Sequence, residues 1–197
     1  MKLESISGMN ASIAIGRLVL SMLLWTGAAA QVVIDPPVSG PFKDPQEAKN
    51  LGGTPGTVEI ELEVKQAQVD IAGTKATLMT YNGLFPGPTI RIKRGETLMI
   101  SLINQLPQSM QTNFLGYHRN ITNLHTHGFH VSPETPEDDV MYHLMPGEAY
   151  QHVYDSRNQR GGTLLFYHPH IHGLAAEQYW AGLIGALVVE DESPVLS

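Results

Sequence analysis

The chain has 197 residues, which is long enough for one domain with a sizeable hydrophobic core. Its 12 Lys and Arg against 19 Asp and Glu give a formal charge of -7, and without a basic run we expect no nucleic-acid partner. The sequence contains no cysteine, which excludes disulfides, zinc ribbons, iron–sulfur clusters, cysteine nucleophiles and any metal site that requires a thiolate.

Residues 1–30 have the composition of a secretory signal peptide. An apolar run at residues 18–25 follows basic residues and precedes small ones, with Ala28 and Ala30 placed where a signal peptidase cleaves. The run is too short to cross a bilayer, so we expect no membrane span after signal removal. We therefore predict export to the periplasm or the extracellular space, with a mature start near Gln31.

Residues 31–54 are rich in Pro and Gly, which predicts an extended lead-in with many turns. From Thr57 the pattern changes, because apolar side chains alternate with glutamates as far as Val64. This period of two is typical of a strand that buries one face and leaves the other in water.

Further short strands are expected within residues 55–192. A hairpin is predicted for residues 69–81, and the apolar segment 97–103 has the pattern of a strand covered on both faces. Two later apolar segments, 163–167 and 183–189, complete the set. Short strands between turn residues, without helical periodicity, predict an all-β, antiparallel sandwich of Greek-key type that forms a single domain.

Two His-x-His motifs contain most of the candidate chemistry. Residues two apart on a strand point to the same face, with Cα atoms roughly 6.6 Å apart, so each motif can hold one metal ion or two neighbouring ions. Two such motifs on adjacent strands would gather four neutral nitrogen ligands, which suit copper or zinc and not magnesium or calcium. We predict a transition-metal site formed by His125, His127, His168 and His170.

The other histidines are interpreted differently. Isolated histidines are usually surface or hydrogen-bonded residues, and we assign His118, His143 and His152 to that group. His130 and His172 lie close to the two motifs, where we prefer a hydrogen-bonding or packing role beside the ligands to direct ligation.

Several motifs, in the same order along the chain, resemble those of the multicopper oxidases, a family that includes laccases, ascorbate oxidase and the bacterial copper-resistance oxidases. They are residues 82–90 (NGLFPGPTI), 94–97 (RGET), 125–128 (HTHG), 146–148 (PGE), 167–170 (YHPH) and 182–191 (GLIGALVVED). The resemblance covers most of the predicted mature chain. It implies that residues 55–192 are the N-terminal plastocyanin-like, or cupredoxin-like, domain of such an oxidase.

Carried over position by position, the resemblance implies copper as the cofactor. His125 would bind the type 2 copper, His127 and His168 one type 3 copper, and His170 the other type 3 copper. Asp138 matches in position an acidic residue that assists proton delivery during oxygen reduction in the family, and Asp139 stands beside it.

The family takes electrons from a reducing substrate at a type 1 copper, which a cysteine binds, and reduces O2 to water at a trinuclear cluster. The remaining cluster histidines come from its last domain. The resemblance therefore implies that this chain supplies half of the cluster and no type 1 site, and that it is inactive alone. Residues 193–197 resemble the start of a linker to a second domain. We expect the missing C-terminal cupredoxin domains, or a partner chain, to complete the site.

Two other functions stay open on the residues alone. A copper-binding or copper-buffering module would work without turnover and without a further domain. A zinc hydrolase ranks last, because zinc enzymes with His-x-His on a strand usually need a third ligand and an acid or base placed by a different motif.

Overall fold

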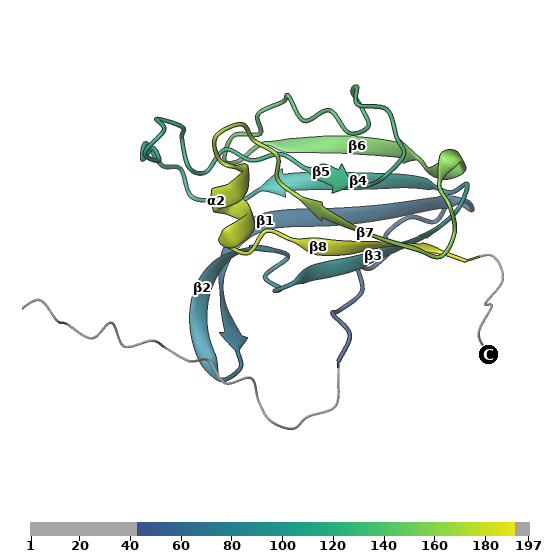
Figure 1. Cartoon of the computed structure of the whole chain (residues 1–197), viewed down its shortest axis with the longest axis horizontal. Coiled ribbons are helices and arrows are strands. Elements are labelled where there is room, and N and C mark those ends of the chain that lie inside the picture. Colours follow the sequence, from purple (N-terminus) through teal and green to yellow (C-terminus); the bar gives the residue numbers. More distant parts are fainter. Residues whose placement is uncertain (1–42, 192–197) are drawn as a thin grey trace, which may run out of the picture. The chain divides into compact units, whose positions relative to one another are not determined.

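The computed structural model describes residues 43–191, and these form two four-stranded sheets with strand orders β2-β1-β4-β6 and β3-β8-β7-β5 (Figure 1). The first sheet contains β1 (Thr57–Ile71), β2 (Thr74–Tyr81), β4 (Thr97–Asn104) and β6 (Ala149–Asp155). The second contains β3 (Gly87–Lys93), β5 (His125–His127), β7 (Thr163–His168) and β8 (Gly185–Glu190). Helical structure in this part of the chain is limited to α2 (Ala175–Trp180) and a 3₁₀ turn, η1 (Ser156–Asn158). The predicted all-β, cupredoxin-like sandwich is confirmed.

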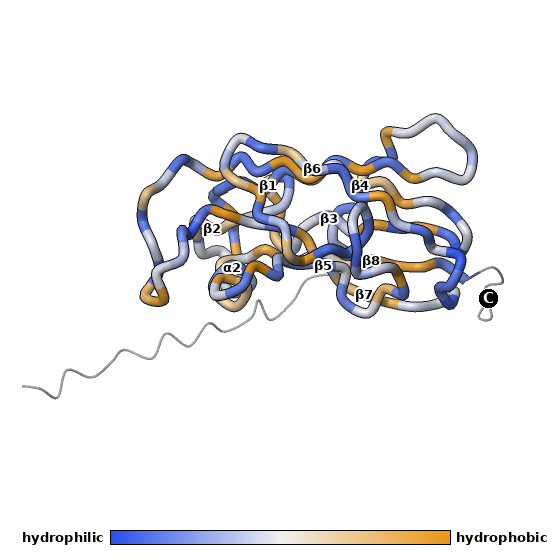
Figure 2. Tube along the Cα trace, turned by 90° about the horizontal axis from the view of Figure 1, so that it is seen from above, coloured by the Kyte–Doolittle hydropathy of each residue, from blue (hydrophilic) through white to orange (hydrophobic). Residues whose placement is uncertain are grey.

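The core lies between the two sheets. Along β1 the predicted alternation is present, because Val58, Ile60, Leu62 and Val64 are buried while the intervening glutamates are more exposed. Figure 2 shows β1, β4 and β6 in one layer and β5, β7 and β8 in the other, with hydrophobic stretches in both. Burial of these apolar faces is the main term that stabilises such a sandwich, which has no disulfide to assist it.

The sheets are mixed, and the expectation of purely antiparallel pairing was wrong. β1 pairs with β4 in parallel, and β3 pairs with β8 in parallel. The remaining strand pairs are antiparallel. The difference arises because the chain crosses between the two layers after β2, β3, β4, β5 and β6, so sequence neighbours often lie in different sheets.

The predicted hairpin is present, but it belongs to a longer strand than expected. β1 has 15 residues, of which Thr57–Val64 pair with β4 and Val64–Ile71 pair with β2. In Figure 1 the second half of β1 and β2 form a curved two-stranded ribbon. None of the side chains of residues 65–71 is buried, and the ribbon reaches the core at the end of β2, where Tyr81 is fully buried. The segment 97–103 lies in β4, where buried and half-buried side chains alternate, so only one face is fully covered.

Residues 43–54 form the described part of the lead-in, and they run mostly exposed beside β3 and β1. Backbone hydrogen bonds join Ala48 N–H to Thr89 O at 2.8 Å and Leu51 N–H to Glu59 O at 2.8 Å. The predicted signal peptide, residues 31–42 of the lead-in and the predicted linker at 193–197 lie outside the described residues. Among the residues that are described, no helix has the length and apolar character needed to cross a membrane.

Candidate metal centre

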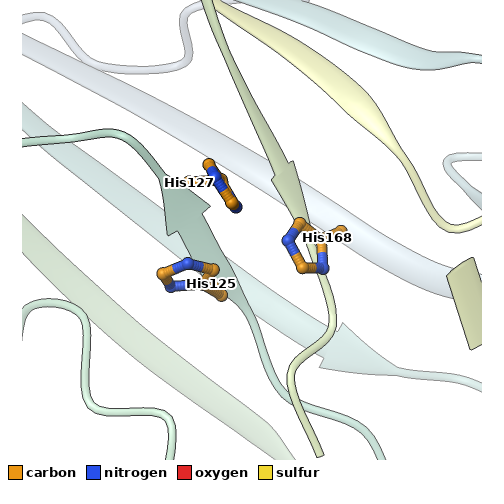
Figure 3. A group of neighbouring side chains, drawn as sticks. All are labelled: His125, His127 and His168. Atoms are coloured by element: carbon orange, nitrogen blue, oxygen red, sulfur yellow. The ribbon is translucent and has the colours of Figure 1, made fainter. Parts of the chain in front are cut away.

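The pairing of β5 with β7 brings the two histidine motifs together. In this antiparallel pair His125 lies opposite His168, and His127 lies opposite Phe166. Because side chains alternate along a strand, both histidines of β5 point to one face, while Thr126 between them is buried. Figure 3 shows His125 and His127 on one strand and His168 on the next, with their rings gathered in one region.

All four predicted histidines converge. The ring of His125 lies 5.6 Å from that of His127, 5.3 Å from that of His168 and 5.1 Å from that of His170, measured between ring centroids. His125, His127 and His168 each offer a ligand atom, and these atoms lie within 4.8 Å of one another. His127 and His170 are exposed, and His125 and His168 are half-buried, so the group opens to the surface of the described domain.

His125 is oriented by Asp138. Its Nδ1 lies 2.6 Å from Asp138 Oδ2, while the other carboxylate oxygen of Asp138 accepts hydrogen bonds from the backbone N–H and the hydroxyl of Thr126, at 2.8 and 2.9 Å. The side chains of His125 and Asp138 are 22% and 12% exposed, so water screens this pair only partly. A carboxylate that accepts the Nδ1 proton leaves Nε2 of the same ring free for a metal ion. Asp139 is engaged elsewhere, by Thr135 and the backbone of Met141.

His168 is oriented in the same sense by the backbone. Its Nδ1 lies 2.8 Å from the carbonyl oxygen of Pro169, which can only accept, so Nδ1 carries the proton and Nε2 remains free. Desolvation lowers the pKa of His168, and the neighbouring imidazoles of the centre lower it further, against an opposing effect of the Pro169 carbonyl. A neutral ring is the form that binds a metal ion.

Aromatic residues and a buried amide hold the other rings. The ring of His127 stacks on Phe166 at 4.4 Å, and the ring of His168 meets Tyr179 of α2 edge-on at 5.8 Å. The backbone N–H of His170 donates to Oδ1 of the buried Asn123 at 2.6 Å. These contacts were not anticipated, since no regular spacing in the sequence connects α2 or Asn123 with the histidine motifs.

The remaining histidines lie outside this cluster of rings. His118, His130 and His143 are exposed, and Nδ1 of the exposed His172 lies 3.3 Å from the hydroxyl of Tyr117. His152 is fully buried and hydrogen-bonded through both ring nitrogens. The sequence did hold a signal for its environment, because Tyr150, His152 and Tyr154 alternate along β6, a strand that was not predicted.

The fold and the cluster of imidazoles define a cupredoxin-like domain that carries a candidate transition-metal centre. The sequence model of the family described as multicopper oxidase matches residues 63–194. The chain belongs to the multicopper oxidase family, which confirms the resemblance seen in the sequence.

Named relatives agree with this assignment. A laccase of Bacillus subtilis (strain 168) is 32% identical in an alignment 175 residues long that covers 79% of this chain and 32% of the laccase. Copper resistance protein A of Pseudomonas syringae pv. tomato is 31% identical over 148 residues, or 73% of this chain and 20% of that protein. Among solved structures, a multicopper oxidase from Campylobacter jejuni, described as a metallo-oxidase, matches with a TM-score of 0.64 and 27% identity, covering 77% of this chain and 30% of that one. This chain therefore spans about a third or less of the length of each of these three proteins.

Proposed function

We propose that this chain is a copper-binding domain that supplies four histidine ligands to the trinuclear cluster of a multicopper oxidase. His125 is assigned to the type 2 copper, His127 and His168 to one type 3 copper, and His170 to the other. The observation that carries this proposal is the convergence of four imidazoles, from β5, the last residue of β7 and the segment just after it, with ring centroids 5.1–6.2 Å from a neighbour. In the complete enzyme, copper bound here would pass to O2 the electrons that a reducing substrate provides, so that O2 is reduced to water.

The donor set fits copper. Imidazole nitrogens suit copper and zinc, and copper stands at the top of the divalent affinity order for such ligands. Nδ1 of His125 and of His168 is already engaged by oxygen atoms of the chain, so each ring presents Nε2 in a fixed orientation. We assign proton delivery to Asp138, because its carboxylate touches His125 and remains partly open to water. Asp139 lacks that contact and is not a candidate for this role.

Further ligands must come from outside this set of four histidines, and we propose that they come from another cupredoxin domain or a partner chain. The exposed rings of His127 and His170 leave room for such ligands. Beside His127, an open apolar hollow of about 420 Å³ is lined by Phe166, Leu164 and Tyr179, among others. Leu164 is 74% exposed, and exposed apolar patches of this kind commonly mark surfaces that another domain or protein covers. We place the assembled protein outside the cytoplasm, on the basis of the signal-like residues 1–30.

The purified chain is expected to bind copper without becoming blue and without oxidising phenols. Binding is favoured because four imidazoles are held close together before the metal arrives. Blue colour requires a cysteine thiolate on copper, and this sequence contains no cysteine. A calorimetric copper titration, an absorption spectrum and a phenol oxidase assay on the same sample check the three statements. Robust O2 consumption by the chain alone would contradict the assignment of half a cluster to it.

Copper affinity is expected to fall as the pH drops below about 6, because a free imidazole has a pKa near 6.5 and a protonated ring cannot bind copper. The sign follows from the binding form: copper takes the neutral ring, so every proton bound competes with the metal. From pH 7.5 to pH 5 we expect a decrease of more than about tenfold, since each competing imidazole contributes up to about tenfold per pH unit below its pKa. Titrations at the two pH values measure this change. An affinity that is independent of pH would argue against histidine ligands.

Complementation and metal competition distinguish the other two functions from the proposed one. A copper-buffering module would keep its copper affinity and show no gain of oxidase activity when the C-terminal domains of a multicopper oxidase are added. A zinc hydrolase would prefer zinc over copper when both are offered in competition and would hydrolyse esters with zinc bound. Preference for copper, together with acquired oxidase activity after such complementation, is the result expected from the proposed function.

A further inference from the structure

A buried histidine that is not part of the metal centre lies on β6, in the other sheet. The ring of His152 is fully buried and stacks on Tyr154, with 5.3 Å between centroids and 4° between planes. Polar atoms buried in a core need hydrogen-bond partners, because an unsatisfied donor or acceptor there destabilises the fold. Both nitrogens of this ring have one.

The direction of each hydrogen bond follows from the chemistry of its partners. Nδ1 of His152 lies 2.7 Å from the carbonyl oxygen of Glu137, which only accepts, so Nδ1 carries the proton. Burial lowers the pKa of His152, so the ring is neutral and Nε2 is an acceptor. The hydroxyl of Tyr142 lies 2.8 Å from Nε2 and donates to it, and the same oxygen accepts from the backbone N–H of Leu124 at 3.1 Å.

The two ends of this series of hydrogen bonds are backbone groups of residues that directly precede two residues of the metal centre. Leu124 is the residue before His125, and Glu137 is the residue before Asp138. One imidazole therefore holds, through its opposite nitrogens, the two backbone segments whose side chains meet at the 2.6 Å contact between His125 and Asp138. Residues 128–148 contain no named strand or helix, so contacts of this kind fix where Asp138 stands relative to β5.

We propose that His152 is a positioning residue for the metal centre: through Tyr142 and the Glu137 carbonyl it sets the distance between Asp138 and His125. That distance keeps the proton of His125 on Nδ1 and leaves Nε2 as the metal-binding atom. The consequence for copper rests on the proposed function, whereas the positioning itself is a property of the chain without metal. Metal-binding geometries tolerate errors of about 0.5 Å, so a small shift of either segment is enough to affect ligation.

The test is nitrogen NMR of the metal-free chain labelled with ¹⁵N-histidine. In the wild type, His125 should appear as a single tautomer with a proton on Nδ1. The resonance of this proton should be shifted to low field by the short hydrogen bond to Asp138. His152→Phe keeps an aromatic ring for the stack on Tyr154 and removes both hydrogen bonds. We expect this variant to lose the low-field signal and to show a mixture of His125 tautomers. Tyr142→Phe removes only the connection to Leu124 and should give an intermediate result.

Rescue and control variants separate positioning from simple destabilisation. His152→Gln offers one acceptor and one donor and should restore most of the low-field signal. Ile60→Val removes one methyl group from the buried face of β1 and lowers stability slightly without touching these bonds, and the His125 signal should stay unchanged. An unaltered His125 tautomer in both folded Tyr142→Phe and His152→Phe would overturn the proposal. If His152→Phe does not fold, the comparison of Tyr142→Phe with His152→Gln and Ile60→Val decides in the same way.

Copper titration of the same variants gives an independent reading. Loss of a partner that orients a ligand typically lowers metal affinity about 10–100-fold, so His152→Phe should bind copper at least about tenfold more weakly than the wild type. If the wild type itself bound no copper, the proposed function would fail. The NMR result would still stand or fall on its own.

Discussion

Replacing His125 by alanine is expected to weaken copper binding by the chain more than about a hundredfold. The removal of a partner that only orients a metal ligand costs about 10–100-fold in affinity, and His125 is assigned as a ligand itself. It also lies nearest the centre of the group, with ring centroids 5.1–5.6 Å from those of the other three histidines. Copper titration of wild type and variant under the same conditions measures the loss.

Two further variants test whether the loss of affinity is specific to the cluster and whether lost packing could cause it. His118→Ala removes an exposed histidine outside the cluster and should leave copper affinity within about twofold of the wild type. His170→Ala removes an exposed member of the cluster, so its loss of affinity cannot be attributed to lost packing. Equal affinities for wild type, His125→Ala and His170→Ala would remove the basis for a copper centre on these residues.

Gly185→Ala is expected to lower the free energy of unfolding by about 3 kcal/mol, at the upper end of the range for overpacked cores. A Cβ at this position would lie 2.2 Å from both Cζ and the hydroxyl oxygen of Tyr167. Tyr167 is itself fully buried and donates a hydrogen bond to Pro88 O at 2.6 Å, so its ring has no free space to move into. For a domain of about 150 residues this corresponds to a melting temperature lower by roughly 10 °C.

Gly53→Ala is the matched control, because nothing lies within 4 Å of a Cβ added there. Its melting temperature should stay within about 2 °C of the wild type. Thermal unfolding followed by circular dichroism distinguishes the two variants. A Gly185→Ala protein as stable as Gly53→Ala would mean that Tyr167 does not pack against this glycine.

The strands that could be predicted are those whose side chains alternate over several residues. The alternation from Val58 to Val64 predicts β1, because one face of this strand is buried along its first half. β5 has three residues, too few for any periodicity, and it is a strand only because β7 lies beside it. The parallel pairs were missed for a similar reason, since strand direction depends on how the chain crosses between the sheets.

For the candidate metal centre, the sequence predicted that the histidines come together but not which contacts orient them. The spacing of His125 and His127 places two rings on one face of any strand, so their convergence follows from local geometry. The sequence alone could not show whether Asp138 or Asp139 contacts His125, because this depends on which of the two adjacent carboxylates faces β5. The hydrogen bonds of Tyr142 and His152 join β6 to residues 128–148 and to the residue before β5, and a linear pattern does not contain such contacts.

The strict opposition of β5 and β7 also limits which changes in length the centre can survive. Thr126 faces the core and its hydroxyl binds Asp138, while His125 and His127 face the other way. Inserting one residue between the two histidines would change the parity of the strand and turn one ring toward the interior. Inserting two would preserve the face but roughly double the separation of the rings along the strand. A separation of two residues is therefore the only spacing that keeps both rings on the same face of the strand and close to each other.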